Sequence, residues 1–421
     1  MKKIAIVSEH ASPLALAGSV DSGGQNIYVA QTARQFAAAG HQVDIFTRRD
    51  DALLPAEVGW YPGVRVIHVP AGPARYVPKE DLLPYMDDFA AFLMRYADRQ
   101  NEPYDVVHAN FFMSALASLP LARRHGIPLA VTFHALGRVR RLHQREADRF
   151  PDSRFQIESD IVREADLVVA ECPQDRRDLL NLYGADPRRI RVVPCGYDPL
   201  EMSPLDTAAA RRKLGWQDGE FRVLQLGRMV PRKGVDNVIE ALGVLHRRYG
   251  VAARLCVVGG DQRDGPELAR LRGVAEQAGV MPFVEFAGRR DRQDLSKYYC
   301  ASDVFVTTPW YEPFGITPVE AMACGRPVVG SDTGGIRSTI KDGKTGFLVP
   351  ARDPEALAAR LARLAHDSRL CRRMGQAGAR RARRLFTWQQ VGQDLLAVYD
   401  ELAVRAGVPA RSPMRPQVLA A

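Results

Sequence analysis

Short apolar runs alternate with amphipathic segments along most of the chain. In the first half, runs rich in Val, Ile, Leu and Ala predict buried strands, and segments with apolar residues at helical spacing stand between them. Strands are expected at residues 3–8, 42–47, 64–69, 105–109, 128–133, 167–171 and 190–194. Helices are expected at residues 26–39, 85–99, 112–124, 156–165 and 173–183. This alternation is typical of parallel sheets joined by crossover helices.

The alternation stops at residues 194–204, where prolines, glycine and aspartate predict a linker. It then restarts, with strands expected at residues 222–226, 254–258, 283–287, 304–308, 327–330 and 346–349. The sequence therefore predicts an α/β protein with two Rossmann-like, doubly wound domains, residues 1–196 and 205–386, that face a central cleft. A helix is expected at residues 387–405. Residues 406–421 show no periodicity and are expected to be disordered.

Composition fits this picture. The chain has 421 residues, of which 46% are hydrophobic and 25% charged, as in globular proteins. Its apolar runs are too short to span a bilayer or to act as a signal peptide. The six cysteines are scattered and lack metal-binding spacing. A cytoplasmic location without a metal or other cofactor is expected.

The net charge of +9 comes with eight lysines and fifty arginines. Such a charge favours anionic partners, namely phosphorylated substrates, nucleotides or an acidic membrane face, so peripheral membrane contact stays open. Nucleic acid is disfavoured because no basic stretch is interleaved with aromatic residues. The densest basic run, residues 380–384, has helical spacing and predicts a solvated helix face.

The segment 312–320 (Glu-Pro-Phe-Gly-Ile-Thr-Pro-Val-Glu) follows a predicted strand and opens a helix. Thr317 as N-cap, Pro318 at the first helical position and Glu320 at the third predict a capping box. A helix that begins past the carboxyl end of a strand favours phosphate, because its free amides and dipole attract anions. With Glu312 and Glu320 as acceptors for hydroxyl hydrogens, the segment predicts a sugar-nucleotide site.

Two further loops carry groups that suit phosphate. Gly23 and Gly24 precede the first helix and would let a phosphate approach the backbone amides. Arg228 and Lys233 follow the strand that opens the second domain, and both side chains suit phosphate oxygens. Arg232, between them, is expected to be a bystander.

Other candidates also stand at strand ends. His134 ends a strand of the first domain, which would point its ring towards the cleft. Gly259 and Arg289 follow strands of the second domain, in loops expected to hold the base.

The spacing of Glu312 and Glu320 resembles the E-x7-E motif of retaining GT-B glycosyltransferases of the family-4 type. The other loops fit the same family, so the resemblance touches both halves of the chain. It implies the GT-B fold and a nucleotide-diphosphate-sugar donor, UDP-glucose or a close relative. It also implies that the helix at 387–405 crosses back onto the first domain.

The resemblance implies a role for each loop. Glu312 would contact hydroxyls of the donor sugar, Glu320 the ribose, and His134 the sugar near the reacting carbon. The implied catalytic residues are Glu312, His134, Arg228 and Lys233. The implied donor-binding residues are Gly23, Gly24, Arg228, Lys233, Gly259, Arg289, Glu312, Phe314, Gly315, Ile316, Thr317 and Glu320.

An acceptor site is implied by similarity to relatives that use inositol phosphate. The positions that resemble their phosphate-binding residues are Asn26, Lys79, Thr132 and Arg154. Phe111 stands where those relatives carry a tyrosine hydroxyl, so the identity of the acceptor, and whether it carries a phosphate, stay open. Sucrose-phosphate synthases share features of the segments 22–25 and 134–137.

The family pattern implies front-face substitution, in which the departing phosphate takes the acceptor's proton. Because no D-x-D stands on a strand-ended loop of the second domain, Arg228, Lys233 and the helix at Thr317 are expected to stabilise the leaving group without a metal. Two alternatives stay open: a catalytically silent sugar-nucleotide-binding protein, and a transferase for a lipid or polysaccharide acceptor. A nicotinamide-dependent epimerase is disfavoured, since no G-x-G-x-x-G follows a strand with an acidic partner.

Overall fold

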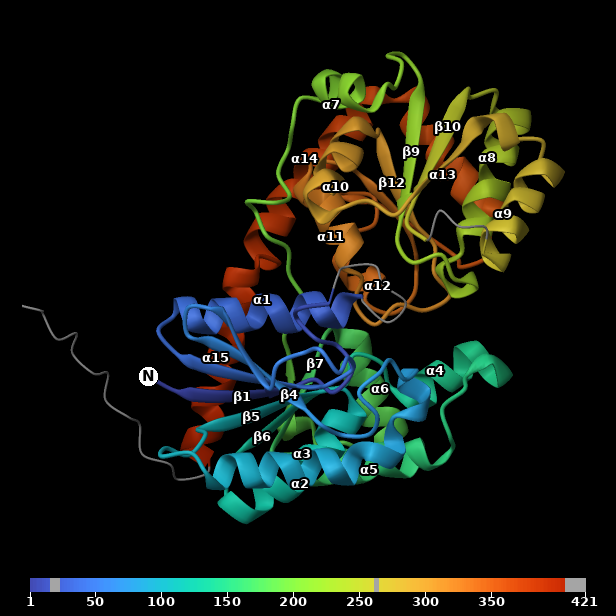
Figure 1. Cartoon of the computed structure of the whole chain (residues 1–421). Helices are drawn as coiled ribbons and strands as arrows, with labels where there is room; N and C mark the ends of the chain where they lie inside the picture. The colour runs from blue at the N-terminus through green and yellow to red at the C-terminus, as the bar shows by residue number, and fades with distance from the viewer. Residues whose placement is uncertain (16–22, 261–264, 406–421) are drawn as a thin grey trace, which may run out of the picture.

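The computed structural model describes residues 1–15, 23–260 and 265–405 and contains two sheets flanked by helices (Figure 1). The first sheet has the strand order β3-β4-β2-β1-β5-β6-β7-β8. Its neighbours pair in parallel, except that β3 runs antiparallel to β4. The strands are β1 (Lys3–Val7), β2 (Gln42–Arg48), β3 (Glu57–Tyr61), β4 (Val64–Val69), β5 (Val106–Asn110), β6 (Leu129–Thr132), β7 (Leu167–Ala170) and β8 (Ile190–Val192).

The second sheet is parallel throughout, with the order β11-β10-β9-β12-β13-β14. Its strands are β9 (Phe221–Leu226), β10 (Ala253–Val258), β11 (Val284–Gly288), β12 (Val304–Thr307), β13 (Val328–Ser331) and β14 (Gly346–Val349). The predicted fold class, two Rossmann-like domains with parallel sheets, is confirmed. The prediction missed β3, an edge strand with no fully buried residue and therefore no continuous apolar run.

Helices connect the strands in both halves. Those before the linker are α1 (Gly24–Ala38), α2 (Met86–Asp98), α3 (Phe112–His125), α4 (Gly137–Gln144), α5 (Ser153–Glu164) and α6 (Pro173–Tyr183). Those after it are α7 (Thr207–Leu214), α8 (Val235–Tyr249), α9 (Pro266–Gln277), α10 (Arg292–Ala301), α11 (Ile316–Ala323), α12 (Ile336–Thr339), α13 (Pro354–His366), α14 (Ser368–Leu385) and α15 (Trp388–Arg405).

Each sheet is apolar on both faces, as expected for parallel strands covered by helices. In β1, Ile4 and Ile6 pack into the core under α1 and α15, whereas Ala5 and Val7 pack on the opposite side with α2 and α3. This two-residue period assigns alternate side chains to different cores. The core under α1 and α15 continues into the second domain, where it includes residues of α10 and α11.

Two segments that join the domains run side by side. The amide of Tyr197 donates to the carbonyl of Phe386 at 2.7 Å, and the amide of Trp388 donates to the carbonyl of Tyr197 at 3.1 Å. Trp388 is buried, and its ring meets the ring of Tyr28 in α1 edge-on. Helix α15 thus starts at the linker and packs along α1 of the first domain (Figure 1).

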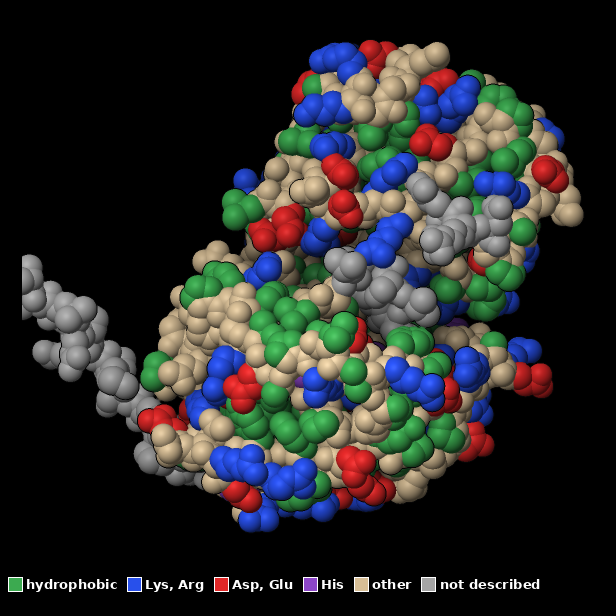
Figure 2. Space-filling view, in the orientation of Figure 1, with side chains coloured by type: hydrophobic (Ala, Val, Ile, Leu, Met, Phe, Trp, Pro, Cys, Tyr) green, Lys and Arg blue, Asp and Glu red, His purple; other side chains and the backbone are tan. Residues whose placement is uncertain are grey.

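On the face shown in Figure 2, Lys and Arg side chains are interspersed with Asp and Glu over both domains. Among residues 1–15, 23–260 and 265–405, no helix combines the length and the apolar character needed to cross a membrane. The predicted disordered tail, residues 406–421, lies outside the described residues.

Removal of the hydroxyl that joins α15 to the first sheet should destabilise the protein. The Tyr399 hydroxyl lies 2.5 Å from Nδ1 of His108, and burial lowers the pKa of His108 to about 3, so the ring is neutral. Tyr399→Phe would leave a buried ring nitrogen without this partner, at a cost of about 1–3 kcal/mol. Urea unfolding followed by tryptophan fluorescence should show the loss. The exposed control Tyr61→Phe should unfold at the same urea concentration as the wild type. Equal unfolding midpoints for Tyr399→Phe and Tyr61→Phe would contradict a stabilising bond between Tyr399 and His108.

Candidate functional site

The carboxyl ends of the two sheets face each other, and loops from both domains meet there (Figure 1). Sγ of Cys172, which follows β7, donates to the carbonyl of Pro313 at 3.2 Å. The rings of His143 in α4 and Tyr311 after β12 are stacked, with centroids 5.0 Å apart. The loop that carries Glu312 therefore touches the first domain on both sides of this glutamate.

Glu312 is a largely buried carboxylate with two cations beside it. Its Oε2 accepts a hydrogen bond from Nζ of Lys233, and Nη1 of Arg232 lies 3.6 Å away. Burial acts to raise the pKa of Glu312, but the positive charges of Lys233, Arg232 and Arg228 outweigh it and hold the pKa below its ordinary value. Burial lowers the pKa of Lys233, against the opposing effect of Glu312. Glu312 is thus an ionised group at neutral pH.

Two glycines of the loop after β13 fix the backbone around Glu312. The amide of Gly335 donates to the carbonyl of Glu312 at 2.9 Å. A Cβ at Gly335 would lie 2.4 Å from Cα of Phe314, and one at Gly334 would lie 2.1 Å from the carbonyl oxygen of Glu312. Only residues without a side chain allow such an approach. Phe314 itself is buried.

The predicted capping box is wrong. Helix α11 begins at Ile316, with Gly315 as its N-cap and no side-chain cap hydrogen bond. Thr317 therefore lies inside the first turn instead of at the cap. Gly315 has a φ of +90°, and a Cβ there would lie 3.4 Å from Cγ of Glu312. The N-terminus of α11, with its partial positive charge, thus begins beside Glu312.

Glu320, predicted to close the capping box with Thr317, is buried, and its carboxylate bonds to side chains of α10. Its Oε1 accepts from Nη1 of Arg292 and its Oε2 from the hydroxyl of Tyr299, both at 2.9 Å. Both partners belong to α10, so Glu320 anchors α11 to α10. The two glutamates of the motif therefore have different surroundings: Glu312 lies at the domain junction, and Glu320 lies in the second domain's interior.

The glycine pair of the first domain approaches the basic loop of the second. A Cβ at Gly23 would lie 3.9 Å from Nε of Arg228, and one at Gly24 would lie 3.6 Å from Cδ1 of Ile316. Residues 21–22 of the same motif lie outside the described residues. Gly23, Gly24, Arg228 and Ile316, all predicted to bind the donor, are thus brought together.

The remaining donor candidates stand where β9, β10 and β11 end. The amide of Gly259 donates to the carbonyl of Gly288 at 2.9 Å, and a Cβ at Gly259 would lie 1.9 Å from the carbonyl oxygen of Gly227. Arg289, directly after β11, is exposed. Asp261, next to this loop, lies outside the described residues.

His134 is held by acceptors from the two neighbouring strand ends. Its Nδ1 lies 3.0 Å from Oε1 of Glu171, and its Nε2 lies 3.0 Å from Oδ1 of Asn110. Burial acts to raise the pKa of Glu171, but His134 and a hydrogen bond from Cys195 lower it overall, despite the repulsion of Glu312. The carboxylates of Glu171 and Glu312 thus repel each other across the domain junction.

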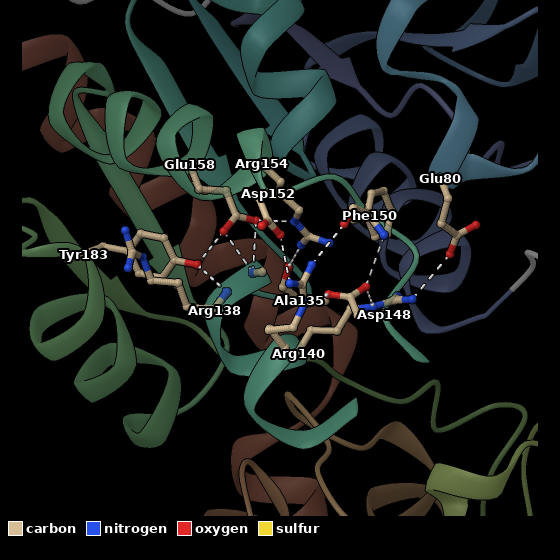
Figure 3. A network of polar contacts seen from close by, with 12 residues as sticks. Glu80, Ala135, Arg138, Arg140, Asp148, Phe150, Asp152, Arg154, Glu158 and Tyr183 are labelled. Carbon is tan, nitrogen blue, oxygen red and sulfur yellow. Dashed lines mark hydrogen bonds and ion pairs between the residues drawn. The ribbon is translucent and has the colours of Figure 1, made fainter. Parts of the chain in front are cut away.

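Arg154, predicted to bind the acceptor's phosphate, is fully buried. Figure 3 shows it within a network of polar contacts. Its Nε donates to Oε1 of Glu158 at 2.7 Å, and its Nη2 donates to the carbonyl of Ala135. Glu158 also accepts from the amide of Gly137 at 2.9 Å. The guanidinium lies over the ring of Phe111, 5.0 Å from its centroid. In this arrangement Arg154 and Glu158 hold the loop after β6.

Two of the other predicted acceptor residues also have internal partners. Oγ1 of Thr132 lies 2.8 Å from Nε2 of the buried His108. Oδ1 of Asn26 accepts from the amide of Gly23 at 2.9 Å and thereby shapes the start of α1. Lys79 is half-buried in a short turn before α2. The acceptor-binding role of these residues stays a prediction.

Sequence reasoning missed several residues of the site. Arg232, interpreted as a bystander, is the second cation beside Glu312. Asn110 and Glu171 directly follow or end their strands, as His134 does, so the same strand-end argument could have found them. The glycines that hold the Glu312 loop lie more than twenty residues further along the chain and give no local signal of this contact.

Two family profiles match this chain. Residues 22–200 match Glycosyltransferase Family 4, and residues 206–381 match glycosyl transferases group 1. A D-inositol 3-phosphate glycosyltransferase from Acidothermus cellulolyticus is 37% identical over 412 residues, which cover 96% of this chain and 91% of that protein. The protein of the same name from Geodermatophilus obscurus is 38% identical over 411 residues, covering 96% and 90%.

Solved structures give the same picture. A sucrose-phosphate synthase from Thermosynechococcus elongatus superposes with a TM-score of 0.88 at 32% identity and covers 96% of this chain and 100% of that one. A protein from Anabaena in complex with UDP superposes with a TM-score of 0.75 at 21% identity, covering 95% and 100%, which shows similarity of fold.

The stability of the first domain should depend on a buried acid beside this site. Burial and the charge of Glu171 raise the pKa of Asp175 to about 8. An unfolded chain releases this proton near pH 4, whereas the folded protein keeps it up to about pH 8, so stability falls as the pH rises through this window.

Asp175→Asn keeps an acceptor for the amide of Glu171 and removes this proton. The variant should be more stable than the wild type by at least ~1 kcal/mol at about pH 8, with a smaller difference at about pH 5. Urea unfolding at both pH values measures this. The exposed control Asp152→Asn should have the same free energy of unfolding as the wild type at both pH values. If the free energy of unfolding of Asp175→Asn changes with pH as that of the wild type does, Asp175 is ionised in the folded protein.

Proposed function

Because this chain belongs to the family-4 glycosyltransferases with the GT-B fold, we propose that it transfers a hexosyl unit with retention of configuration. The donor is a nucleotide-diphosphate sugar, UDP-glucose or a close relative. The acceptor is a hydroxyl of a small molecule such as a sugar phosphate or inositol phosphate. The observation that carries this proposal is Glu312, held by Lys233 and Arg232 beside the N-terminus of α11.

The cations around Glu312 suit a leaving diphosphate. Arg228 and Lys233 belong to the loop after β9, and the helix dipole of α11 adds partial positive charge next to them. As the bond between the sugar carbon and the phosphate oxygen breaks, these groups would stabilise the negative charge that develops on the diphosphate. Fixed cations of this kind supply the stabilisation that a divalent ion gives in other transferases.

Glu312 from the second domain and His134 from the first would contact different parts of the donor sugar. Glu312, ionised and next to the donor loops, accepts hydrogen bonds from hydroxyls of the donor sugar. His134, fixed by Glu171 and Asn110, contacts the sugar from the first domain near the reacting carbon. The acceptor oxygen bonds to this carbon on the face from which the phosphate leaves, and the acceptor's proton passes to the departing phosphate oxygen.

The acceptor is proposed from the relatives. The relatives from Acidothermus cellulolyticus and Geodermatophilus obscurus, 37% and 38% identical to this chain, are named for inositol 3-phosphate, and the sucrose-phosphate synthase is named for a phosphorylated product. A phosphorylated acceptor also fits the net charge of +9. Lys79 is the half-buried cation among the predicted acceptor residues.

The two glutamates should differ in their effect on turnover. Glu312→Gln keeps the shape and removes the charge at the donor sugar, so kcat should fall at least ~100-fold. Glu320→Gln alters an internal contact to α10 and should lower kcat less than ~10-fold while it lowers the melting temperature. Steady-state kinetics and thermal unfolding measure both. The exposed control Glu355→Gln should match the wild type, and equal losses of kcat for the two motif glutamates would refute their separate roles.

Donor and acceptor can be identified by nucleotide release. UDP-, ADP- and GDP-sugars should be tested with hexose phosphates, inositol phosphate and neutral sugars, with and without EDTA. We expect release with one donor and a phosphorylated acceptor, unchanged by EDTA because the fixed cations stabilise the leaving group.

Loss of activity in EDTA that is restored by a divalent ion would contradict metal independence. Activity with neutral sugars alone would contradict the phosphorylated acceptor. Silence across the panel, with UDP still raising the melting temperature, would favour a lipid or polysaccharide acceptor instead.

A further inference from the structure

Helix α14 presents a row of arginines to solvent. Its eighteen residues include no aspartate or glutamate, and its buried side consists of apolar or small residues that pack on α11 and α13. The exposed arginines form two groups, at residues 369–373 and 380–384. Each group contains arginines three and four residues apart, and the last of the first group precedes the first of the second by seven residues, about two turns, which places both groups on one side of the helix. This arginine stripe consists of Arg369, Arg372, Arg373, Arg380, Arg383 and Arg384.

No guanidinium group of the stripe forms a hydrogen bond or ion pair with another residue that the structure describes. The half-buried Arg381 on the same helix differs, because it donates to the carbonyls of Thr339 and Ser338. Other exposed arginines do form ion pairs, among them Arg123 with Glu164, Arg124 with Asp98 and Arg163 with Asp160. Like charges one turn apart destabilise a helix. The stripe is therefore an arrangement that an anionic surface would stabilise.

The shape of the stripe distinguishes between anionic partners. A helix of eighteen residues is roughly 27 Å long, so its arginines form a straight row rather than a pocket. The helix has no aromatic residue on which a nucleic-acid base could stack. The stripe also has no exposed apolar side chain, whereas the centre of a protein interface is usually apolar.

We infer that the arginine stripe of α14 docks the protein on the surface of a bilayer that contains anionic lipids. A flat layer of headgroup phosphates meets every arginine of a straight row, and guanidinium groups pair well with phosphate oxygens. The contact is electrostatic, without insertion of side chains into the acyl region. Figure 1 shows α14 along the outer side of the second domain, with its C-terminal end at the linker.

Co-sedimentation with vesicles tests this. The full-length protein should bind vesicles of phosphatidylcholine with phosphatidylglycerol, should not bind pure phosphatidylcholine, and should be released by salt. Each arginine near an anionic surface contributes about fivefold to binding. The triple variant Arg380→Gln, Arg383→Gln, Arg384→Gln should therefore bind at least tenfold more weakly.

Two matched variants serve as controls. The triple Arg123→Gln, Arg124→Gln, Arg163→Gln removes the same charge from exposed sites in the first domain and should bind as the wild type does. The triple Arg380→Lys, Arg383→Lys, Arg384→Lys keeps the charge and should retain most of the binding.

Absence of wild-type binding to the anionic vesicles would overturn the proposal. Equal weakening by the two glutamine triples would overturn it as well, because net charge and not the stripe would then drive binding. Capture of acidic protein or nucleic acid without vesicle binding would assign the stripe to a different partner.

Discussion

The charge on Glu312 is the constraint on which the rest of the site depends. A carboxylate withdrawn from water is stable only beside opposite charge. Lys233 and Arg232 supply that charge from a different loop, so the ion pair holds the loops after β9 and β12 together. Cations that are fixed before the donor arrives need no reorganisation when a diphosphate binds, which is the condition for effective electrostatic stabilisation.

The architecture brings these loops within reach. Strands β9 and β12 are neighbours in the second sheet, so their carboxyl ends adjoin. Gly234 has a left-handed backbone, and a Cβ there would lie 2.1 Å from the carbonyl oxygen of Thr308, so only glycine lets Lys233 come this close. On the other side, Trp388 and the linker tie α15 to the first domain, and the core under them continues between the domains. If the two domains close around a substrate, they would rotate about these two joining segments.

Sequence patterns predicted most of the strands because buried parallel strands have continuous apolar sequences. The strand-end argument placed Arg228, Glu312 and His134 in loops at the carboxyl ends of strands, and their role in binding stays a prediction. The cap of α11 could not be predicted this way. Thr317 and Glu320 have the right spacing, but tertiary contacts with Arg292 and Tyr299 decide where Glu320 points. Burial of Arg154 also depends on partners from other elements, since the sequence does not show which aromatic rings surround it.

Calorimetric titration of UDP into the wild type and Arg228→Ala shows whether the loops after β9 and β12 hold a nucleotide diphosphate. Arg212→Ala, an exposed change in α7, is the matched control. UDP should bind to the wild type and the control, and at least ~10-fold more weakly to Arg228→Ala, as expected for loss of a charge-assisted bond to phosphate. Absence of UDP binding to the wild type, or equal affinity for all three proteins, would contradict a diphosphate site in these loops.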